Sequence, residues 1–578
     1  MMTTSQWSNQ KRSKRTQGLD LLLGLMLFTA ALGVRWWYAS AVVFPPSDEA
    51  AFYLTTAENL LTGRGLEVDV VWSYLIPFPG VTHPSHEQWM PLTTGLIAAA
   101  WAAQQLLSGA LEASLRLAQM PGLILGALLA PLTYLVGRRA LPGDRGSILN
   151  SWQGSRWVSL GAGLLVAVNA PLSLQSASLD SSAPLVLLTA WALTLAVRMP
   201  GDRGGYFGAG LLAALAYLTH AEGVLLLIAI PLAWWLLPVP RRPLTELPDE
   251  IRSHPAAMTA WKQRPRDEGS EEEWGRALGP SMIHVLDLIV AFGLAVTPWL
   301  LRNYLAFGTP LPGAGLHQLW LSDPVDTFNY LSQPTPQTWL AQGWQAILQQ
   351  RGQALLFNSG VLLRSTFPWG LLALPGLWLL RREWPLFPSL VYGLLLFFGV
   401  ALVLPIASMS GAFERSLGVL MPLLALAALY VIQRVVQRIH RLRTLAEIAA
   451  IAIVVLLVVM AGKQVTSTLP TVSERQQAEK GQFEAAANWL TQHTAPGDVV
   501  MTAQTYRLNY ISGQPCIALP GNEPPEAAWQ AAQQYGARTL MLTEPFGQYP
   551  QILKDQPDPR FRLLEETEEM TVYEIRGD

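Results

Sequence analysis

Residues 11–53 read KRSKRTQGLDLLLGLMLFTAALGVRWWYASAVVFPPSDEAAFY, and they decide the class of fold. Four basic residues precede an apolar run from Leu19 to Val34, which approaches the roughly 20 residues that cross a bilayer. Because Lys and Arg favour the cytoplasmic side, we predict a cytoplasmic N-terminus. Asp48 and Glu49 follow soon after this run. The sequence therefore predicts two carboxyl groups at the outer membrane surface.

The composition of the whole chain agrees with a membrane protein. Of 578 residues, 51% are hydrophobic and 14% are charged, against roughly 25% charged in soluble proteins. The formal net charge of -2 argues against a nucleic-acid-binding protein, which needs a basic excess. Cys516 is the single cysteine, which excludes an intrachain disulfide and a cysteine-based zinc site.

Apolar runs of near-spanning length continue to residue 462 and indicate about eleven transmembrane helices. The segment 91–107 is treated differently, because counting it as a span would place the arginines between Arg138 and Arg156 outside, against the positive-inside rule. We therefore predict a helix lying at the membrane interface. With this assignment the outer loops before the last span hold few basic residues, namely Arg64, Arg116, Arg302, Arg351 and Arg415.

The predicted organisation is a cytoplasmic tail at 1–18, a membrane domain at 19–462 and a soluble domain at 463–578. The C-terminal part alternates helix and strand patterns and, after an odd number of spans, is expected to be a small extracytoplasmic α/β domain. The membrane domain contains three long connections: a first outer loop at 39–115 with juxtamembrane helices, a polar cytoplasmic loop at 239–282 and an outer loop or lid at 301–362. The predicted fold class is a polytopic α-helical membrane protein carrying this domain.

Asp48 and Glu49 are the first candidates for chemistry. An ionised carboxylate near hydrocarbon is costly unless it has a partner or a task. A carboxyl group with a raised pKa can act as a general base. The structural alternative is a helix N-cap, because Ser47, Asp48 and Glu49 precede a helical stretch.

Other polar residues fall in outer turns: Asp180, His220, Glu222, Arg302, Tyr304 and Arg415. Arg302 and Arg415 oppose the preference of arginine for the inner side and suit bidentate binding of phosphate. Their structural alternative is a salt bridge to Glu414 or Glu222, and each of the remaining residues also fits a solvated loop or an interface anchor. We expect the first-loop acids and these arginines to meet in one pocket above the lipid headgroups.

Three stretches resemble the GT-C superfamily of membrane glycosyltransferases, in particular the glycosyltransferase family 39 group, which includes protein O-mannosyltransferases and the aminoarabinose transferase of lipid A. The stretches are DEAAFY at 48–53, THP at 82–84 leading to PL at 91–92, and TPWLLRNY at 297–304. Weaker matches are THAEG at 219–223 and Arg415 ahead of MP at 421–422. The resemblance covers residues 20 to about 435, and 483–520 is similar to the outer domain of bacterial members.

This resemblance implies a multi-pass glycosyltransferase of the cytoplasmic membrane that acts in glycosylation of the cell envelope. It would transfer a hexosyl or pentosyl group from a polyprenyl-phosphate donor to a hydroxyl of a lipid, glycan or protein acceptor outside, with inversion. Asp48 would be the general base, Glu49 a neighbouring acid that tunes it, and Glu87 a second first-loop acid. The donor phosphate would contact Arg302, Arg415 and Tyr304, and the substrates would contact Tyr53, His83, His86, Asp180, His220 and Glu222.

Residues 85–90 depart from the compact HPPL pattern of the family, which leaves the roles of His83, His86 and Glu87 open. These three could ligate a metal, but their spacing around Pro84 does not resemble a zincin helix. We therefore assign no cofactor and leave a divalent cation open. The alternative function is a polytopic transporter or lipid flippase, which would need polar residues along a path through the membrane.

Overall fold

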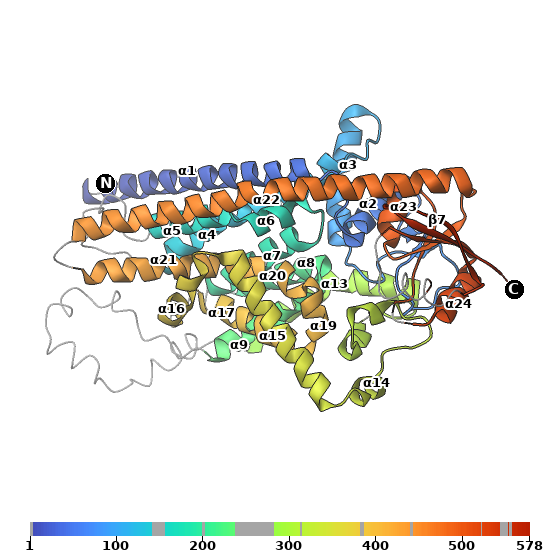
Figure 1. Cartoon of the computed structure of the whole chain (residues 1–578). Coiled ribbons are helices and arrows are strands. Elements are labelled where there is room, and N and C mark those ends of the chain that lie inside the picture. The colour runs from blue at the N-terminus through green and yellow to red at the C-terminus, as the bar shows by residue number, and fades with distance from the viewer. Residues whose placement is uncertain are drawn as a thin grey trace.

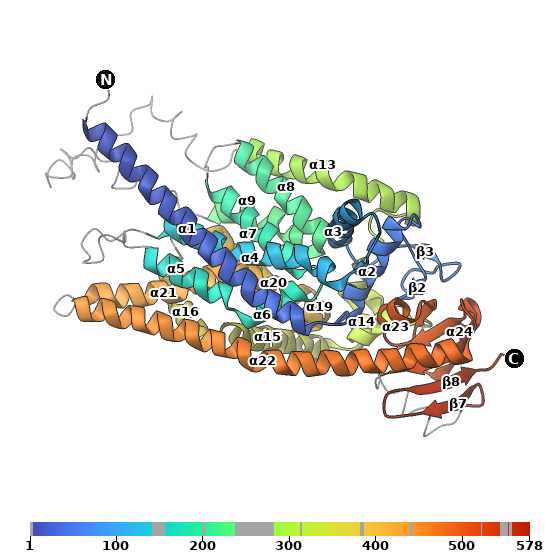
Figure 2. The same cartoon turned by 90° about the horizontal axis from the view of Figure 1, so that it is seen from above.

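The computed structural model describes residues 4–141, 156–198, 203–236, 282–312, 315–381, 386–439, 443–521, 523–543, 553 and 558–577. The predicted cytoplasmic loop at 239–282 lies outside these ranges, apart from its last residue. The chain forms a long helical bundle with a mixed α/β domain at one end (Figures 1 and 2). We call the end of the bundle next to this domain the capped end.

The long helices of the bundle are α1 (Thr4–Ala41), α4 (Leu115–Ala140), α13 (Met282–Phe307), α21 (Met421–Arg438) and α22 (Arg443–His493). Shorter helices between them are α5 (Arg156–Ala167), α6 (Ala170–Ala177), α7 (Ser182–Arg198), α8 (Arg203–Thr219), α9 (Leu226–Leu236), α15 (Trp344–Thr366), α16 (Gly370–Leu380) and α17 (Phe387–Leu394). Within the described residues, five helices are long and apolar enough to span a membrane, α5 and α6 form one bent pair, and five more helices are shorter and apolar. The predicted polytopic α-helical membrane fold is confirmed.

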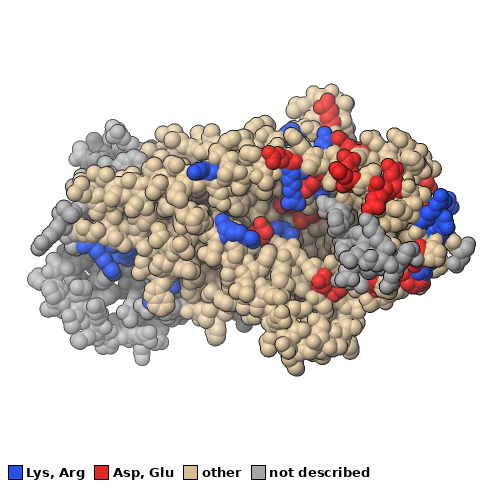
Figure 3. All heavy atoms as spheres, viewed as in Figure 1, with Lys and Arg blue, Asp and Glu red and all other residues tan. Residues whose placement is uncertain are grey.

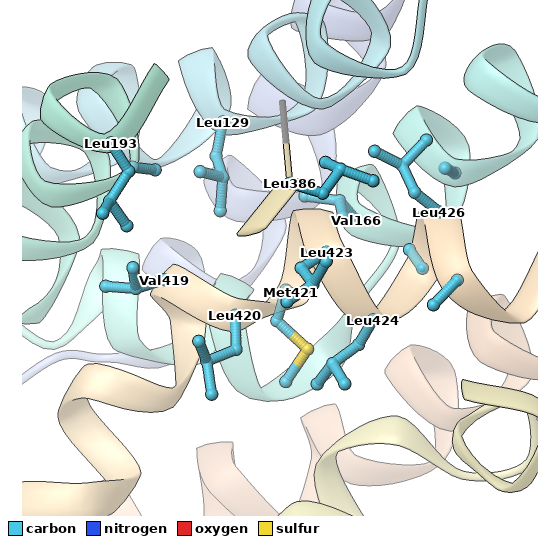
Figure 4. Packing of buried hydrophobic residues seen from close by; sticks show 14 of the residues in the cluster. Leu129, Val166, Leu193, Leu386, Val419, Leu420, Met421, Leu423, Leu424 and Leu426 are labelled. Carbon is cyan, nitrogen blue, oxygen red and sulfur yellow. The ribbon is translucent and has the colours of Figure 1, made fainter. Parts of the chain in front are cut away.

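Helix α21 forms the centre of the bundle. Its apolar side chains pack against α4, α5, α16 and α22 and are almost all buried, as the leucines and Met421 in Figure 4 illustrate. Gly376 lets α16 approach closely, because a Cβ atom there would lie 2.0 Å from the carbonyl oxygen of Ala427. By contrast, α1, α13 and α22 are largely exposed and lie at the outside of the bundle, as expected for lipid-facing helices.

The first outer loop contains α2 (Asp48–Leu61), which is buried, and α3 (Leu92–Ser108), which is partly exposed. Helix α3 lies across the direction of α1, as the two views of Figures 1 and 2 show together. It is not among the candidate spans, and Leu106 and Leu107 at its end are exposed. The helix predicted at 91–107 is therefore present, and its position at the membrane interface stays a prediction.

The α/β domain contains a six-stranded sheet in the order β2-β5-β4-β6-β8-β7. Its strands are β2 (Val70–Val71), β4 (Val499–Thr502), β5 (Cys516–Ala518), β6 (Ala537–Leu542), β7 (Phe561–Glu566) and β8 (Thr571–Ile575), with helices α23 (Thr505–Ser512) and α24 (Pro525–Tyr535). The first four strands of the sheet order pair in parallel, and β8 pairs antiparallel with β6 and β7. Strand β2 comes from the first outer loop, so this loop is part of the sheet.

Helix α22 joins the bundle to this domain without interruption. Its 51 residues correspond to a length of roughly 75 Å at 1.5 Å per residue. The sequence predicts a span at 446–462 and a separate helix near 474–491, whereas both belong to this one helix. The boundary placed between residues 462 and 463 therefore falls inside a continuous element.

Candidate functional site

The start of α2 directs Asp48 and Glu49 to different neighbours. Ser47 is the N-cap, because its side chain accepts a hydrogen bond from the backbone N–H of Ala50 at 3.2 Å. Neither acid is therefore needed to cap its own helix. Successive helix residues point about 100° apart, so the two carboxylates face different parts of the capped end.

Asp48 faces the α/β domain. Its Oδ1 atom accepts a hydrogen bond from the backbone N–H of Arg507, in the first turn of α23, at 3.0 Å. The backbone of Tyr506 and the side chain of Trp72 also hydrogen-bond to this carboxylate. Burial raises the pKa of Asp48 to about 6, although these hydrogen bonds and the charge of Arg507 act in the opposite direction. Asp48 is thus ionised near neutral pH but readily accepts a proton.

Glu49 faces the membrane helices. Its Oε1 atom accepts hydrogen bonds from Ser181, through the hydroxyl at 2.6 Å and the backbone N–H at 3.2 Å, and from the hydroxyl of Tyr53 at 3.3 Å. Its Oε2 atom lies 3.8 Å from Nη1 of Arg415. Of the two adjacent acids, Glu49 therefore approaches Arg415, whereas the arginine beside Asp48 is Arg507. The expected meeting of both acids with Arg302 and Arg415 in one pocket is seen only for the pair Glu49 and Arg415.

Asp180 completes this acidic group. One of its oxygens accepts a hydrogen bond from the backbone N–H of Ser182 at 2.8 Å. Burial and the neighbouring charge of Glu49 raise the pKa of Asp180 well above its ordinary value. Two carboxyl groups therefore share a buried environment beside one arginine.

Arg415 is only partly engaged by the protein. Its Nε atom is buried and has no hydrogen-bond partner within the described residues, and the nearest acidic oxygen is the one at 3.8 Å on Glu49. Buried donors are normally satisfied, so an open guanidinium is suited to an anionic ligand. The structural alternative was a salt bridge from Arg415 to Glu414 or Glu222. The acid that lies near Arg415 is Glu49 instead.

His220 and Glu222 form a contact of their own in the short turn after α8. The Nδ1 atom of His220 lies against a carboxylate oxygen of Glu222. Burial and the nearby positive charge of Arg415 lower the pKa of His220 well below its ordinary value. This pair therefore lies within electrostatic range of Arg415.

Arg302 is held mainly by the first outer loop. Its guanidinium donates to the carbonyl oxygens of Ser85 at 2.9 Å and Leu66 at 3.4 Å. It also lies 5.0 Å from the ring centre of Trp299 and 5.3 Å from that of Phe307. These contacts fasten the loop to α13. The guanidinium of Arg302 therefore has more protein contacts than the guanidinium of Arg415.

The histidines and Glu87 of the first loop are buried near Arg302. His86 contacts the hydroxyls of Ser85 at 2.8 Å and Thr94 at 3.0 Å, and burial lowers its pKa to about 3. Glu87 has a raised pKa because it is buried, and its Oε2 atom has no hydrogen-bond partner within the described part of the chain. His83 stacks on a phenylalanine, and both of its ring nitrogens face carbonyl oxygens at 2.9 Å.

Tyr304 and the suggested metal site are not supported by this arrangement. The side chain of Tyr304 is 57% exposed and is not brought into the buried groups described above. In the described ranges, no three His, Cys, Asp or Glu side chains are grouped so that they could hold a metal ion. Because the ring nitrogens of His83 and His86 contact protein atoms, we derive no metal-dependent step.

The outer segment predicted as a lid is fastened to the α/β domain. Glu523 accepts hydrogen bonds from the backbone N–H groups of Leu331 at 3.0 Å and Ser332 at 2.7 Å, and from that of Tyr330 at 2.5 Å. The Ser332 hydroxyl also donates to Glu523 at 2.8 Å. This carboxylate therefore acts as a clamp between the segment and the domain.

The surface view in Figure 3 shows that acidic and basic side chains gather at the capped end, whereas the visible side of the bundle carries few charges. Sequence reasoning missed four residues that complete these groups: Trp72, Ser181, Tyr506 and Arg507. None of them stands out in its local sequence. Their importance comes from contacts between segments that are far apart in the chain.

The fold was compared with known proteins. The crystal structure of ArnT from Cupriavidus metallidurans bound to undecaprenyl phosphate matches with a TM-score of 0.55 at 13% identity, over 95% of this chain and 97% of that chain. The apo form of the same protein matches with a TM-score of 0.51 at 12% identity, over 97% of this chain and 98% of that chain. No family model and no curated protein matches the sequence. The chain therefore shares its fold with the ArnT structures, as the resemblance implied.

Proposed function

We propose that the chain is an integral-membrane glycosyltransferase that moves a sugar from a polyprenyl-phosphate donor to an acceptor hydroxyl at the extracytoplasmic face. The observation that carries the proposal is the grouping of carboxylates and arginines from separate turns at the capped end of a GT-C fold. Glu49, Asp180 and Arg415 meet there although they belong to distant parts of the sequence. The ArnT structure contains a polyprenyl phosphate, which agrees with a lipid-linked donor.

In the proposed reaction, the acceptor oxygen attacks the anomeric carbon while the bond from that carbon to the phosphate oxygen breaks. The electron pair of the broken bond leaves with the lipid phosphate, and the proton of the acceptor passes to Asp48. A single displacement inverts the anomeric configuration. Asp48 suits this role because burial brings its pKa close to neutral pH, where a base is both ionised and effective.

Glu49 and Arg415 have complementary parts in this proposal. Arg415 stabilises the charge that develops on the departing phosphate, since its Nε donor is buried and open. Glu49 accepts hydrogen bonds from Ser181 and Tyr53, so it orders the turn between α6 and α7 and keeps Asp180 close. Glu87 is the second first-loop acid. Arg302 is also proposed to bind the donor. Its hydrogen bonds to carbonyl oxygens of the first outer loop hold it next to this loop.

Transport has less support than transfer. In the described part of the bundle, the charged side chains with almost no exposure are Arg35 and Arg156. Arg35 donates to Ser176 and to the carbonyl oxygens of Ala31 and Ala167, and Arg156 pairs with Asp20 at 3.0 Å. These residues bind neighbouring helices together and do not form a polar path through the bundle.

The test is an assay of the purified full-length protein with a panel of polyprenyl-phosphate sugars, followed by mass measurement of the products. Formation of a glycosylated acceptor and free polyprenyl phosphate supports the proposal. An absence of transfer from every donor, with a folded protein, would overturn it. Analysis of the anomeric configuration of the product tests inversion independently of the choice of base.

A further inference from the structure

The first outer loop and the α/β domain form one folded unit. Strand β2 adds to the edge of the sheet by pairing in parallel with β5, with Val70 opposite Cys516 and Val71 opposite Ile517. The backbone N–H of Cys516 also donates to the carbonyl oxygen of Asp69 at 3.0 Å. The loop that carries Asp48 is therefore ordered by residues near the other end of the chain.

Helix α23 brings the domain directly onto Asp48. The carboxylate lies at the N-terminal end of this helix, where unpaired N–H groups and the helix dipole favour an anion. Ser47 already caps α2, so the position of Asp48 is set by α23 and not by its own helix. An anchored helix would therefore fix the direction of the carboxylate.

Arg507 provides this anchor. Its Nη2 atom donates to Glu479 of α22 at 2.6 Å, and its Nη1 atom donates to Gln504 at 2.6 Å. Its guanidinium lies 4.5 Å from the ring centre of Phe483 and 5.1 Å from that of Phe44. The Arg507 side chain is 5% exposed, so the ion pair is shielded from solvent. Arg507 thus joins α22, α23 and the segment just before Asp48.

Tyr506 connects the same helix to Glu87. Its ring packs against Phe52 at 5.2 Å and Trp89 at 5.5 Å, measured between ring centres. Its hydroxyl interacts electrostatically with the Glu87 carboxylate, and within the described residues this buried hydroxyl has no hydrogen-bond partner. The side chain therefore lies within electrostatic range of both first-loop acids, Asp48 and Glu87.

We propose that Tyr506 and Arg507 are positioning residues of the transfer site, and that the α/β domain completes this site by holding Asp48 and Glu87. This inference rests on the proposed function, in which Asp48 is the general base. The groups that face Asp48 are Arg507 and Tyr506 on α23, Trp72 of the first loop and the Cys516 thiol on β5. The charges of Asp48 and Glu87 both act on the Tyr506 hydroxyl.

The main variant is Arg507→Gln in the full-length protein. It removes the positive charge that lowers the pKa of Asp48, so the acidic limb of the kcat/KM profile should move to higher pH by roughly 0.5 to 1 unit. Arg507→Lys keeps the charge and should return the limb toward its original position. Arg475→Gln is the matched control, because Arg475 pairs with the same Glu479 at 2.6 Å but its exposed side chain does not contact Asp48.

A purely structural role for Arg507 predicts that Arg507→Gln and Arg475→Gln both leave the acidic limb in place, and that result would overturn the inference. Tyr506→Phe serves as a second variant, because it keeps the ring contacts and removes only a hydroxyl. We expect it to lower kcat about 3- to 10-fold at an unchanged midpoint of thermal unfolding. Tyr510→Phe, on the same helix, is its control and should leave kcat unchanged. Equal kcat values for the two variants would contradict the part assigned to Tyr506.

A second measurement separates this inference from the proposed function. Carbodiimide labels protonated carboxyl groups, and peptide mass spectrometry measures labelling of Asp48 as a function of pH without any donor sugar. If no donor supports transfer, the proposed function fails, but an upward shift of the Asp48 labelling curve in Arg507→Gln still supports control of Asp48 by the domain. An unchanged curve in that variant rejects this control whether or not the protein is active.

Discussion

Replacing Asp48 with Asn tests the central assignment, because the amide keeps the shape and the acceptor for the backbone N–H of Arg507 but cannot act as the base. A general base contributes roughly 10²- to 10⁴-fold to the rate, so kcat should fall by about this factor. For the unmodified protein, a pKa of about 6 means that roughly nine-tenths of the molecules have an ionised Asp48 at pH 7 and about one-tenth at pH 5. Its kcat/KM should therefore fall about tenfold between these two values.

Asp48→Asn should lower the rate, but it should leave the stability of the folded protein equal or higher. Burial raises the pKa of Asp48 from 3.8 to about 6, so ionising it in the folded state costs up to about 3 kcal/mol. This cost is absent below about pH 4 and complete above about pH 6. Asp48→Asn removes it, so the variant should unfold at an equal or higher temperature at pH 7.

The assay measures product mass and initial rate from pH 5 to pH 8, together with thermal unfolding. Asp69→Asn is the control, because Asp69 lies in the same loop and pairs with the exposed Arg64 at 2.7 Å. It should leave the rate within about twofold. A folded Asp48→Asn protein with the original rate and pH profile would refute the assignment of the base.

The remaining predictions concern binding and the clamp. Arg415→Ala should raise the KM for the donor roughly 10- to 100-fold, as loss of a charged hydrogen bond predicts, and a titration of donor concentration measures this. Arg302→Ala should weaken use of the lipid donor and also lower the free energy of unfolding by about 1 to 3 kcal/mol, because the carbonyl of Ser85 loses its donor; chemical unfolding measures the second effect. Glu523→Ala should speed proteolytic cleavage within residues 323–343, and an unchanged cleavage rate would show that the clamp does not hold this segment.

Hydropathy and charge placement predict most of the fold. The apolar runs and the positive-inside rule indicate the polytopic bundle and the interfacial helix at 91–107, because both signals are local in sequence. The two-residue strand β2 could not be predicted, since its pairing depends on β5 at the far end of the chain. The continuous helix α22 was divided in two because its composition changes from apolar to polar while its backbone does not.

For the proposed site, the sequence predicts which turns carry the candidate residues but not which side chains meet. The approach of Glu49 to Arg415 at 3.8 Å agrees with the expected meeting of acids and arginines. Asp48 does not follow this expectation, because the arginine beside it is Arg507 and not Arg302 or Arg415. Adjacent residues on a helix diverge, and no pattern within the first loop can reveal a partner in the α/β domain.

The hydrogen bond between Asp48 and α23 joins residues 459 positions apart, which has a consequence for how the protein is made. During translation the first outer loop emerges long before β5 and α23, because Arg507 of α23 follows Asp48 by 459 residues. Contacts of such high sequence separation also form late in folding. A nascent polypeptide that stops before α23 thus carries Asp48 without the neighbours that orient it, so the proposed site can form only after synthesis has passed this helix.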